Sequence, residues 1–247
     1  MTPSKTKSPY LIVSLDVPLE RALAIIDDTK DLVPVFKVGP ALFNASGIKG
    51  LEALAKKGAK FFIDLKLHDI PNTVSLGLSA LFESSIASSI WAVTLHTLGG
   101  YAMLKAAREQ RDKHSSDALL LGVTVLTSLK ERDLYRVGIN RDVNAQVKKL
   151  AILASDAGLD GVIASSGEIS AIRKACGKDF LILTPGIKLE AYNKLNTDQK
   201  RVASPQDALE AGSNGLIIGR DIYNNENPRQ RVEAVLGIVK SCYGKVK

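Results

Sequence analysis

The sequence predicts an α/β protein, a closed (β/α)8 TIM barrel that takes up residues 1–247 as one domain. Eight short aliphatic runs alternate with longer amphipathic segments, which predicts a parallel sheet built from βα units. The runs are apolar almost throughout, as in parallel strands that are covered on both faces. Eight such units in about 250 residues match the usual size of this barrel. An open doubly wound sheet competes with it, but no G-x-G-x-x-G follows the first run.

The expected elements follow one another regularly along the chain. The strands are predicted from β-branched and aliphatic runs at Tyr10–Leu15, Val35–Gly39, Phe61–Leu67, Ile90–His96, Leu119–Leu126, Gly161–Ala164, Phe180–Thr184 and Gly215–Gly219. The helices are predicted from the amphipathic segments at Leu19–Lys30, Leu42–Lys57, Thr73–Ser84, Tyr101–Arg111, Ala145–Ala157, Glu168–Ala175, Pro205–Ala211 and Pro228–Cys242. Residues 1–9 are polar, and we expect them to form a flexible N-terminal tail.

Composition and charge narrow the class of protein. With 45% hydrophobic and 24% charged residues, the chain is neither collagen-like nor disordered. The net charge of +7 fits an anionic ligand, but no basic stripe with aromatic residues predicts nucleic-acid binding. The longest apolar stretch, 118–126, is about half of the ~20 residues that a membrane helix needs. Two cysteines predict neither a zinc site nor a disulfide framework. We therefore expect a soluble cytoplasmic protein without nucleic-acid or membrane partners.

The strongest chemical signal is a cluster of charges at the third expected strand. Asp64 and Lys66 are two residues apart and therefore point to the same side of a strand, and Asp69 follows just after it. Catalysis in these barrels takes place at the carboxyl ends of the strands. A solvated charge pair is the alternative, although charges beside an apolar strand are costly unless they are paired. Lys66 is a candidate proton donor because burial and neighbouring charges tune the pKa of a lysine.

Two more charges occupy equivalent positions on the first two expected strands. Asp16 ends the first strand and Lys37 lies inside the second. Taken alone, Asp16 could cap the following helix and Lys37 could extend to solvent. Adjacent strands would bring Lys37 close to Asp64. The expected result is an alternating chain of Lys37, Asp64, Lys66 and Asp69.

The second signal is a phosphate site at the other end of the chain. Pro185 and Lys188 follow the seventh expected strand, and Gly219 and Arg220 follow the eighth. Loops at these positions of a barrel commonly bind phosphate. Gly219 permits a close approach of the backbone, and Arg220 can hold a phosphate with two hydrogen bonds. A tight turn with a surface arginine is the alternative reading.

A long polar segment and three histidines complete the candidates. Residues 188–204 lack a periodic pattern, and we expect a loop that closes over the barrel mouth. His68 is expected to orient neighbouring groups or to bond to the loop rather than to bind a metal, His96 to line the mouth or make a structural hydrogen bond, and His114 to be solvated. Their spacing does not predict a metal site, and no nucleotide or cofactor motif is present. No cofactor and no metal are therefore expected.

These residues resemble a known family. The run Asp64-Leu65-Lys66-Leu67-His68-Asp69-Ile70-Pro71-Asn72-Thr73 is similar to the signature of the orotidine 5′-phosphate decarboxylases, bacterial type. The resemblance extends over nearly the whole chain. Supporting matches are Leu15-Asp16, Phe36-Lys37-Val38-Gly39, His96 with Gly99-Gly100, Val123 to Ser128, Thr184-Pro185-Gly186-Ile187, Asp198-Gln199-Lys200-Arg201 and Gly219-Arg220.

The resemblance implies an activity and a role for each matching residue. The family converts orotidine monophosphate to uridine monophosphate and CO2, the last step of de novo pyrimidine synthesis, as a homodimer with shared active sites and without a cofactor. Lys66 would protonate the carbon that loses CO2, and Asp64 would lie against the reacting carboxylate. The other implied substrate contacts are Asp16 and Lys37 at the ribose, Asp69, Ile70 and Thr73 from the neighbouring subunit, Thr127 or Ser128 at the pyrimidine, and Pro185, Lys188, Gln199, Gly219 and Arg220 toward the phosphate, with Gln199 on the closing loop.

Two departures from the family pattern and two other functions remain open. Lys188 stands where bacterial members usually have arginine, and Asp221 places a negative charge beside Arg220. We expect Asp221 to cap the following helix or to point away. A magnesium-dependent, hexulose-phosphate synthase-like lyase shares the D-x-K-x-x-D core, but His68 and the segment 70–73 favour the decarboxylase. A phosphate- or nucleic-acid-binding protein without catalysis is supported only by the excess of basic over acidic residues.

Overall fold

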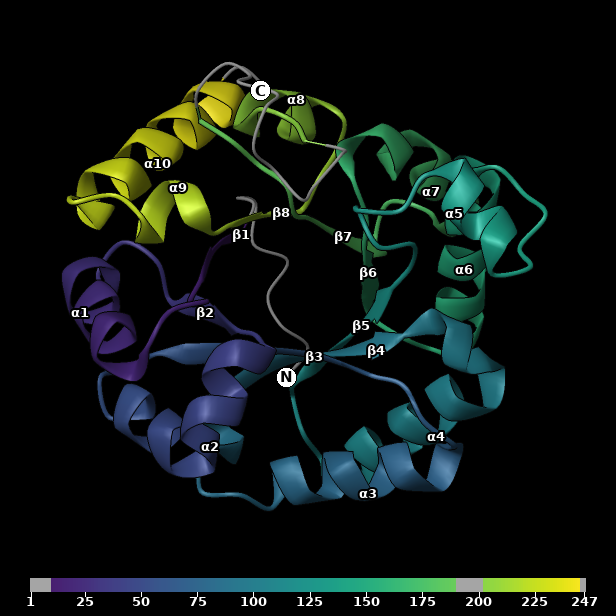
Figure 1. Ribbon diagram of the computed structural model, residues 1–247, viewed down its shortest axis with the longest axis horizontal. Coiled ribbons are helices and arrows are strands. Elements are labelled where there is room, and N and C mark those ends of the chain that lie inside the picture. The colour runs from purple at the N-terminus through teal and green to yellow at the C-terminus, as the bar shows by residue number, and fades with distance from the viewer. Residues whose placement is uncertain (1–9, 190–201, 245–247) are drawn as a thin grey trace.

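A computed structural model describes residues 10–189 and 202–244, and they form a closed barrel of parallel strands surrounded by helices (Figure 1). Each strand pairs with its neighbours in sequence, and β8 closes the barrel on β1. The strands are β1 (Tyr10–Ser14), β2 (Val35–Val38), β3 (Lys60–Leu67), β4 (Ile90–His96), β5 (Leu119–Val123), β6 (Gly161–Ile163), β7 (Leu181–Thr184) and β8 (Gly215–Ile218). The predicted fold class is confirmed.

All eight predicted helices are present, with ends that shift by a few residues. The helices are α1 (Leu19–Thr29), α2 (Pro40–Ala55), α3 (Pro71–Phe82), α4 (Gly100–Lys113), α5 (Glu131–Arg136), α6 (Val143–Asp156), α7 (Ile169–Cys176), α8 (Pro205–Glu210), α9 (Arg220–Tyr223) and α10 (Pro228–Gly244). The helices α5 and α9 were not predicted, because four to six residues are too short to show an apolar period. No helix within 10–189 and 202–244 is both long and apolar enough to cross a membrane.

Two apolar layers hold the barrel together. Side chains that point outward from the strands pack against the surrounding helices and form the larger layer. Inward-pointing side chains, among them Ile12, Leu121 and Ile217, fill the barrel. Phe62 lies edge-on to Trp91 in this inner layer, with ring centroids 6.1 Å apart. The filled interior supports the charged side chains at the mouth and excludes water from below them.

The pairing between β3 and β4 is irregular at the charged residues. Ile63 pairs with Val93 and Leu67 pairs with Leu95, so that residues 64–66 lie opposite Thr94 alone. Lys66 has a φ of 52°, in the left-handed region that residues other than glycine seldom adopt. A simple alternation of side chains was expected here. The structure instead brings Asp64 and Lys66 together through a bulge.

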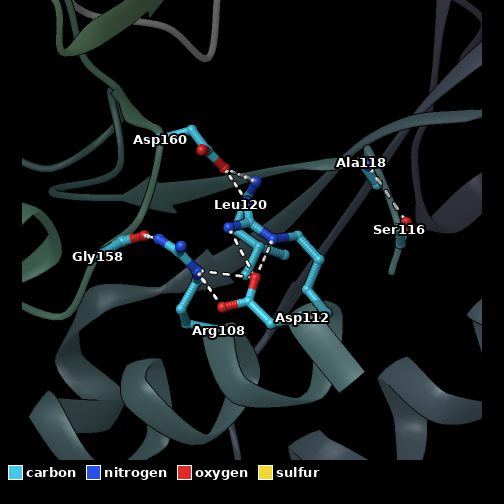
Figure 2. Close-up of polar contacts among 8 residues, drawn as sticks. Arg108, Asp112, Ser116, Ala118, Leu120, Gly158 and Asp160 are labelled. Atoms are coloured by element: carbon cyan, nitrogen blue, oxygen red, sulfur yellow. Dashed lines mark hydrogen bonds and ion pairs between the residues drawn. The ribbon is translucent and has the colours of Figure 1, made fainter. Parts of the chain in front are cut away.

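A polar cluster lies at the amino ends of β5 and β6, where α4 leads into β5 (Figure 2). The side chain of Arg111 is only 10% exposed, and its Nη1 donates to Asp160 Oδ2 at 2.6 Å. The same carboxylate oxygen accepts from the Leu120 N–H at 2.7 Å. Arg108 donates to the Gly158 carbonyl at 2.6 Å and pairs with Asp112. Burial opposes ionisation of Asp112, but hydrogen bonds from both arginines outweigh it and lower the pKa of this carboxyl.

Removing Arg111 is expected to destabilise the barrel more than removing Arg108. Arg111→Ala leaves the charge of Asp160 without its buried partner, and we expect a loss of about 3 kcal/mol in the free energy of unfolding. Arg108→Ala removes more exposed contacts and is expected to cost about 1 kcal/mol. Urea denaturation at neutral pH measures both. A loss for Arg111→Ala no larger than that for Arg108→Ala would contradict the importance of the buried pair.

Candidate active site

A cavity of about 350 Å³ opens at the carboxyl ends of the strands. Phe62, Ile163 and Ile217 of the inner apolar layer form part of its lining. Nine of the predicted site residues also line it, namely Asp16, Lys37, Asp64, Lys66, Thr127, Pro185, Lys188, Gly219 and Arg220. The residues therefore come from six strands or the segments that follow them, and they share one concave site.

Four alternating charges lie along one wall of the cavity. Lys37 Nζ is 3.3 Å from Asp16 Oδ1 and 3.5 Å from Asp64 Oδ2. Lys66 Nζ is 3.0 Å from the same oxygen of Asp64. The side chains of Lys37 and Asp64 are only 11% and 12% exposed. Charges so deeply buried persist because each has an opposite charge in contact.

Two hydroxyl groups that the sequence reasoning missed complete this array. Ser14 Oγ donates to Asp16 Oδ2 at 2.8 Å, and Thr94 Oγ1 donates to Asp64 Oδ1 at 3.1 Å. Both residues are buried. Both could have been found from the sequence as hydroxyl residues within otherwise apolar strands, because a buried polar group needs a partner.

Two glycines allow the charged groups to approach the backbone. A Cβ on Gly39 would lie 2.8 Å from Asp16 Oδ1 and 3.2 Å from Lys37 Nζ, so a larger residue would disturb this ion pair. A Cβ on Gly219 would lie 3.2 Å from the ring of Tyr223 and 3.3 Å from Ser14 Cβ. This crowding gives glycine at position 219 a steric reason that differs from the predicted approach of the backbone to phosphate, and the role of Gly39 was not foreseen.

The predicted phosphate end is built from the segments after β7 and β8. Pro185 and Lys188 line the cavity together with Gly219 and Arg220. The segment after β7 is fixed by two backbone hydrogen bonds, from Lys188 N to Ala203 O at 3.0 Å and from Ala203 N to Gly186 O at 3.1 Å. Gln199 and most of the expected loop 188–204 lie outside the described residues.

Asp221 lines the cavity but makes a different contact from the one expected. Its Oδ2 accepts a hydrogen bond from the Leu189 N–H at 2.9 Å. The carboxylate therefore neither caps the helix that follows nor stands unpaired beside the predicted phosphate site. It ties the segment after β8 to the segment after β7. Tyr223 lines the same end, where burial and the charge of Asp16 raise the pKa of its hydroxyl.

Four predicted residues lie outside the cavity lining. Asp69, Ile70 and Thr73 are exposed at the rim, where the chain leaves β3 and starts α3, and Ser128 is half-buried. Asp69 Oδ1 accepts from the Ile70 N–H at 2.7 Å. The expected chain ending in Asp69 is therefore wrong within one subunit, because the turn into α3 carries this carboxylate away. Of the two candidates for the pyrimidine contact, only Thr127 borders the cavity.

The three histidines fall into two groups. His68 and His96 stack with ring centroids 5.2 Å apart. Burial, His68 and Lys66 lower the pKa of His96, and its Nδ1 accepts from the Leu98 N–H at 3.4 Å, which fits a neutral ring. The expectation that His114 is solvated was wrong. Its side chain is 18% exposed, and its Nε2 contacts Ser79 Oγ at 3.0 Å and Gln110 Nε2 at 2.9 Å.

The fold and the cavity define a class of protein, a (β/α)8-barrel enzyme with paired ammonium and carboxylate groups at the carboxyl ends of its strands. The chain belongs to the orotidine 5′-phosphate decarboxylase / HUMPS family, whose model matches residues 9–235. The class of enzyme that these comparisons support is a carboxy-lyase, as the sequence predicted.

Individual relatives agree with this assignment. Orotidine 5′-phosphate decarboxylase from Legionella pneumophila (strain Paris) is 42% identical over 231 residues, which are 93% of this chain and 98% of that protein. The enzyme of the same name from Carboxydothermus hydrogenoformans is 42% identical over 234 residues, covering 93% and 95% of the two chains. A crystal structure of orotidine 5′-phosphate decarboxylase from Lactobacillus acidophilus superposes with a TM-score of 0.79 at 35% identity, covering 94% and 99%.

Proposed function

We propose that this protein decarboxylates orotidine 5′-phosphate to uridine monophosphate and CO2, at the end of de novo pyrimidine synthesis. The observation that carries the proposal is the alternating array of Asp16, Lys37, Asp64 and Lys66 on one wall of the cavity. Membership of the decarboxylase family and relatives of that name support the substrate.

In this proposal Lys66 stabilises and then protonates the carbanion. The bond between ring carbon C6 and the carboxylate breaks, CO2 leaves, and the electron pair stays on C6. The ring offers no electron sink for that pair, so an ammonium group nearby lowers the energy of the transition state. Transfer of a proton from Lys66 Nζ to C6 completes the product. No metal or organic cofactor takes part.

The neighbouring charges would hold Lys66 and the sugar in place. Asp64 Oδ2 contacts both ammonium groups and would lie next to the reacting carboxylate of the substrate. Asp16 and Lys37 would bind the ribose hydroxyls. Thr127 borders the cavity and would contact the pyrimidine ring. Binding groups on both sides of the reacting carbon restrict the substrate to a productive orientation.

The phosphate would bind at the other end of the cavity. Lys188 and Arg220 supply positive charge there, with Gly219 leaving room for the phosphate oxygens and Gln199 expected to join them. Binding energy from a group that does not react can be used to orient the reacting one. Lys188 keeps the charge of the usual arginine but not its paired hydrogen bonds.

The protein is proposed to act as a homodimer with shared sites. The rim next to Asp69 exposes large apolar side chains, with Ile70 65% and Tyr101 49% exposed. They lie around α3 and α4, which pack side by side in the lower part of Figure 1. Burial of this surface against a second copy would remove apolar area from water. It would also carry Asp69, Ile70 and Thr73 toward the cavity of the partner.

Turnover of orotidine 5′-phosphate by the purified protein tests this function. Ultraviolet absorbance should show loss of the orotate chromophore, and a chelator should leave the rate unchanged. No turnover by a folded protein would contradict the proposal and direct the assay to magnesium-dependent cleavage of sugar phosphates. Loss of turnover with chelator would contradict the metal-free reaction.

Asp221 offers a test of the phosphate end. Asp221→Ala removes the acceptor of the Leu189 N–H, and we expect the KM for orotidine 5′-phosphate to rise roughly tenfold because the segment of Lys188 loses its anchor. Asp221→Asn keeps an oxygen acceptor and removes a negative charge, so its KM should equal or fall below that of the wild type. Glu226→Gln, at a nearby exposed acid, is the matched control. A lower KM in both Asp221 variants would show that the carboxylate only repels phosphate.

A further inference from the structure

Thr94 lies at the centre of the irregular pairing between β3 and β4. The residue is fully buried. Its Oγ1 accepts a hydrogen bond from the Lys66 N–H at 2.8 Å and donates one to Asp64 Oδ1 at 3.1 Å. One side chain of β4 therefore contacts both the backbone of Lys66 and the carboxylate of Asp64. Thr94 does not itself line the cavity.

The backbone contact compensates for the bulge. Three residues of β3 lie opposite Thr94, so the regular ladder of hydrogen bonds is interrupted there. A buried N–H without an acceptor is costly, and the hydroxyl of Thr94 supplies one to Lys66. Lys66 also has the strained φ of 52°, which surrounding contacts must maintain. The hydroxyl is thus a direct support for the conformation that directs Lys66 into the cavity.

The side-chain contact of Thr94 gives the two carboxylate oxygens of Asp64 different partners. A threonine hydroxyl has one proton to donate. With the Lys66 N–H bound to its oxygen, this proton is directed at Asp64 Oδ1. Oδ2 remains for the ammonium groups of Lys66 at 3.0 Å and Lys37 at 3.5 Å. Thr94 therefore contacts the carboxylate whose other oxygen lies against both ammonium groups.

We propose that Thr94 is a positioning residue for the decarboxylation, which fixes Lys66 and Asp64 through a single hydroxyl. The proposal rests on the proposed function of Lys66 and adds a residue that acts without touching the substrate. Misplacement of a reacting group by about 1 Å can cost roughly a hundredfold in rate. The hydroxyl should therefore affect kcat, whereas the groups that bind ribose and phosphate should keep KM nearly unchanged.

Substitutions that keep or remove the hydroxyl test this role. Thr94→Val has nearly the same shape, and we expect kcat to fall roughly tenfold to a hundredfold with KM within about twofold of the wild type. Thr94→Ser keeps the hydroxyl and should restore most of kcat. Thr29→Val is the matched control, because Thr29 is a buried threonine of α1 whose hydroxyl donates to the Ile25 carbonyl, away from the cavity. It should leave kcat unchanged. If Thr94→Val does not fold, Thr94→Ala and Thr94→Ser provide a pair that differs only in the hydroxyl.

Amide hydrogen exchange gives a second readout that does not depend on turnover. In Thr94→Val the Lys66 N–H should exchange faster than in the wild type, and in Thr94→Ser it should stay protected. A kcat of Thr94→Val within about threefold of the wild type, an equal loss in Thr94→Ser, or a change in KM alone would overturn the positioning role. A wild type that does not turn over orotidine 5′-phosphate would instead refute the proposed function. In that case, unchanged Lys66 exchange in Thr94→Val would overturn the role of Thr94 separately.

Discussion

Lys66→Ala is expected to abolish turnover of orotidine 5′-phosphate while the barrel remains folded. The variant removes the proposed proton donor and the positive charge next to the developing carbanion. General acid catalysis contributes roughly two to four orders of magnitude and a single electrostatic donor roughly two to three, so we expect kcat to fall by roughly four orders of magnitude or more. Stopped and continuous ultraviolet assays at saturating substrate measure this loss.

The controls separate chemistry from folding and binding. Lys66 lies at the mouth with a side chain 35% exposed, so its loss should change the thermal unfolding midpoint little. Calorimetric titration with uridine monophosphate should still show binding. Lys60→Ala removes an exposed lysine from the start of the same strand and should retain turnover. Activity of Lys66→Ala within tenfold of the wild type would refute the assigned role of Lys66.

Much of the fold was predictable because its pattern is repeated. Apolar runs such as Ile90–His96 are buried on both faces and give the same signal eight times, so the barrel was indicated even where strand ends shifted. The short helices α5 and α9 could not be predicted in this way. Helix α5 depends on local contacts, such as the bond from the Lys130 N–H to Asp133 Oδ2 at 2.9 Å, rather than on an apolar stripe.

The site residues that are charged and lie within apolar strands could be predicted from the sequence. Contacts that depend on how distant segments pack together could not. Lys37 and Asp64 were found because a charge inside a buried strand requires a partner. The bulge at Lys66 was not predicted, because a register shift depends on how two strands pair and leaves no recognisable pattern in the sequence of either strand. Likewise, the bond of Asp221 to Leu189 joins segments 32 residues apart. Neighbouring residues in the sequence suggested only that Asp221 caps the following helix or points away.

The shared site predicts that two inactive variants restore each other. Lys66→Ala loses the proposed proton donor of its own cavity, and Asp69→Ala loses a group offered to the cavity of the partner. Each variant alone should be nearly inactive. In a mixed dimer, one cavity combines an intact Lys66 with an intact Asp69 and the other lacks both. Random exchange of equal amounts gives half mixed dimers, so about one quarter of the wild-type activity should return.

The experiment depends on demonstrated exchange of subunits. Differently tagged Lys66→Ala and Asp69→Ala proteins are mixed under mild dissociating conditions, and mixed dimers are isolated through both tags before the assay. A matched mixture of Lys66→Ala with Asp64→Ala, two residues of the same cavity, should stay inactive because every combination leaves each cavity without one of its own groups. Asp69 is exposed and lies outside the cavity of its own subunit, so recovery is expected only if the partner's cavity uses it. Purified mixed dimers of Lys66→Ala and Asp69→Ala that remain inactive would rule out the shared site.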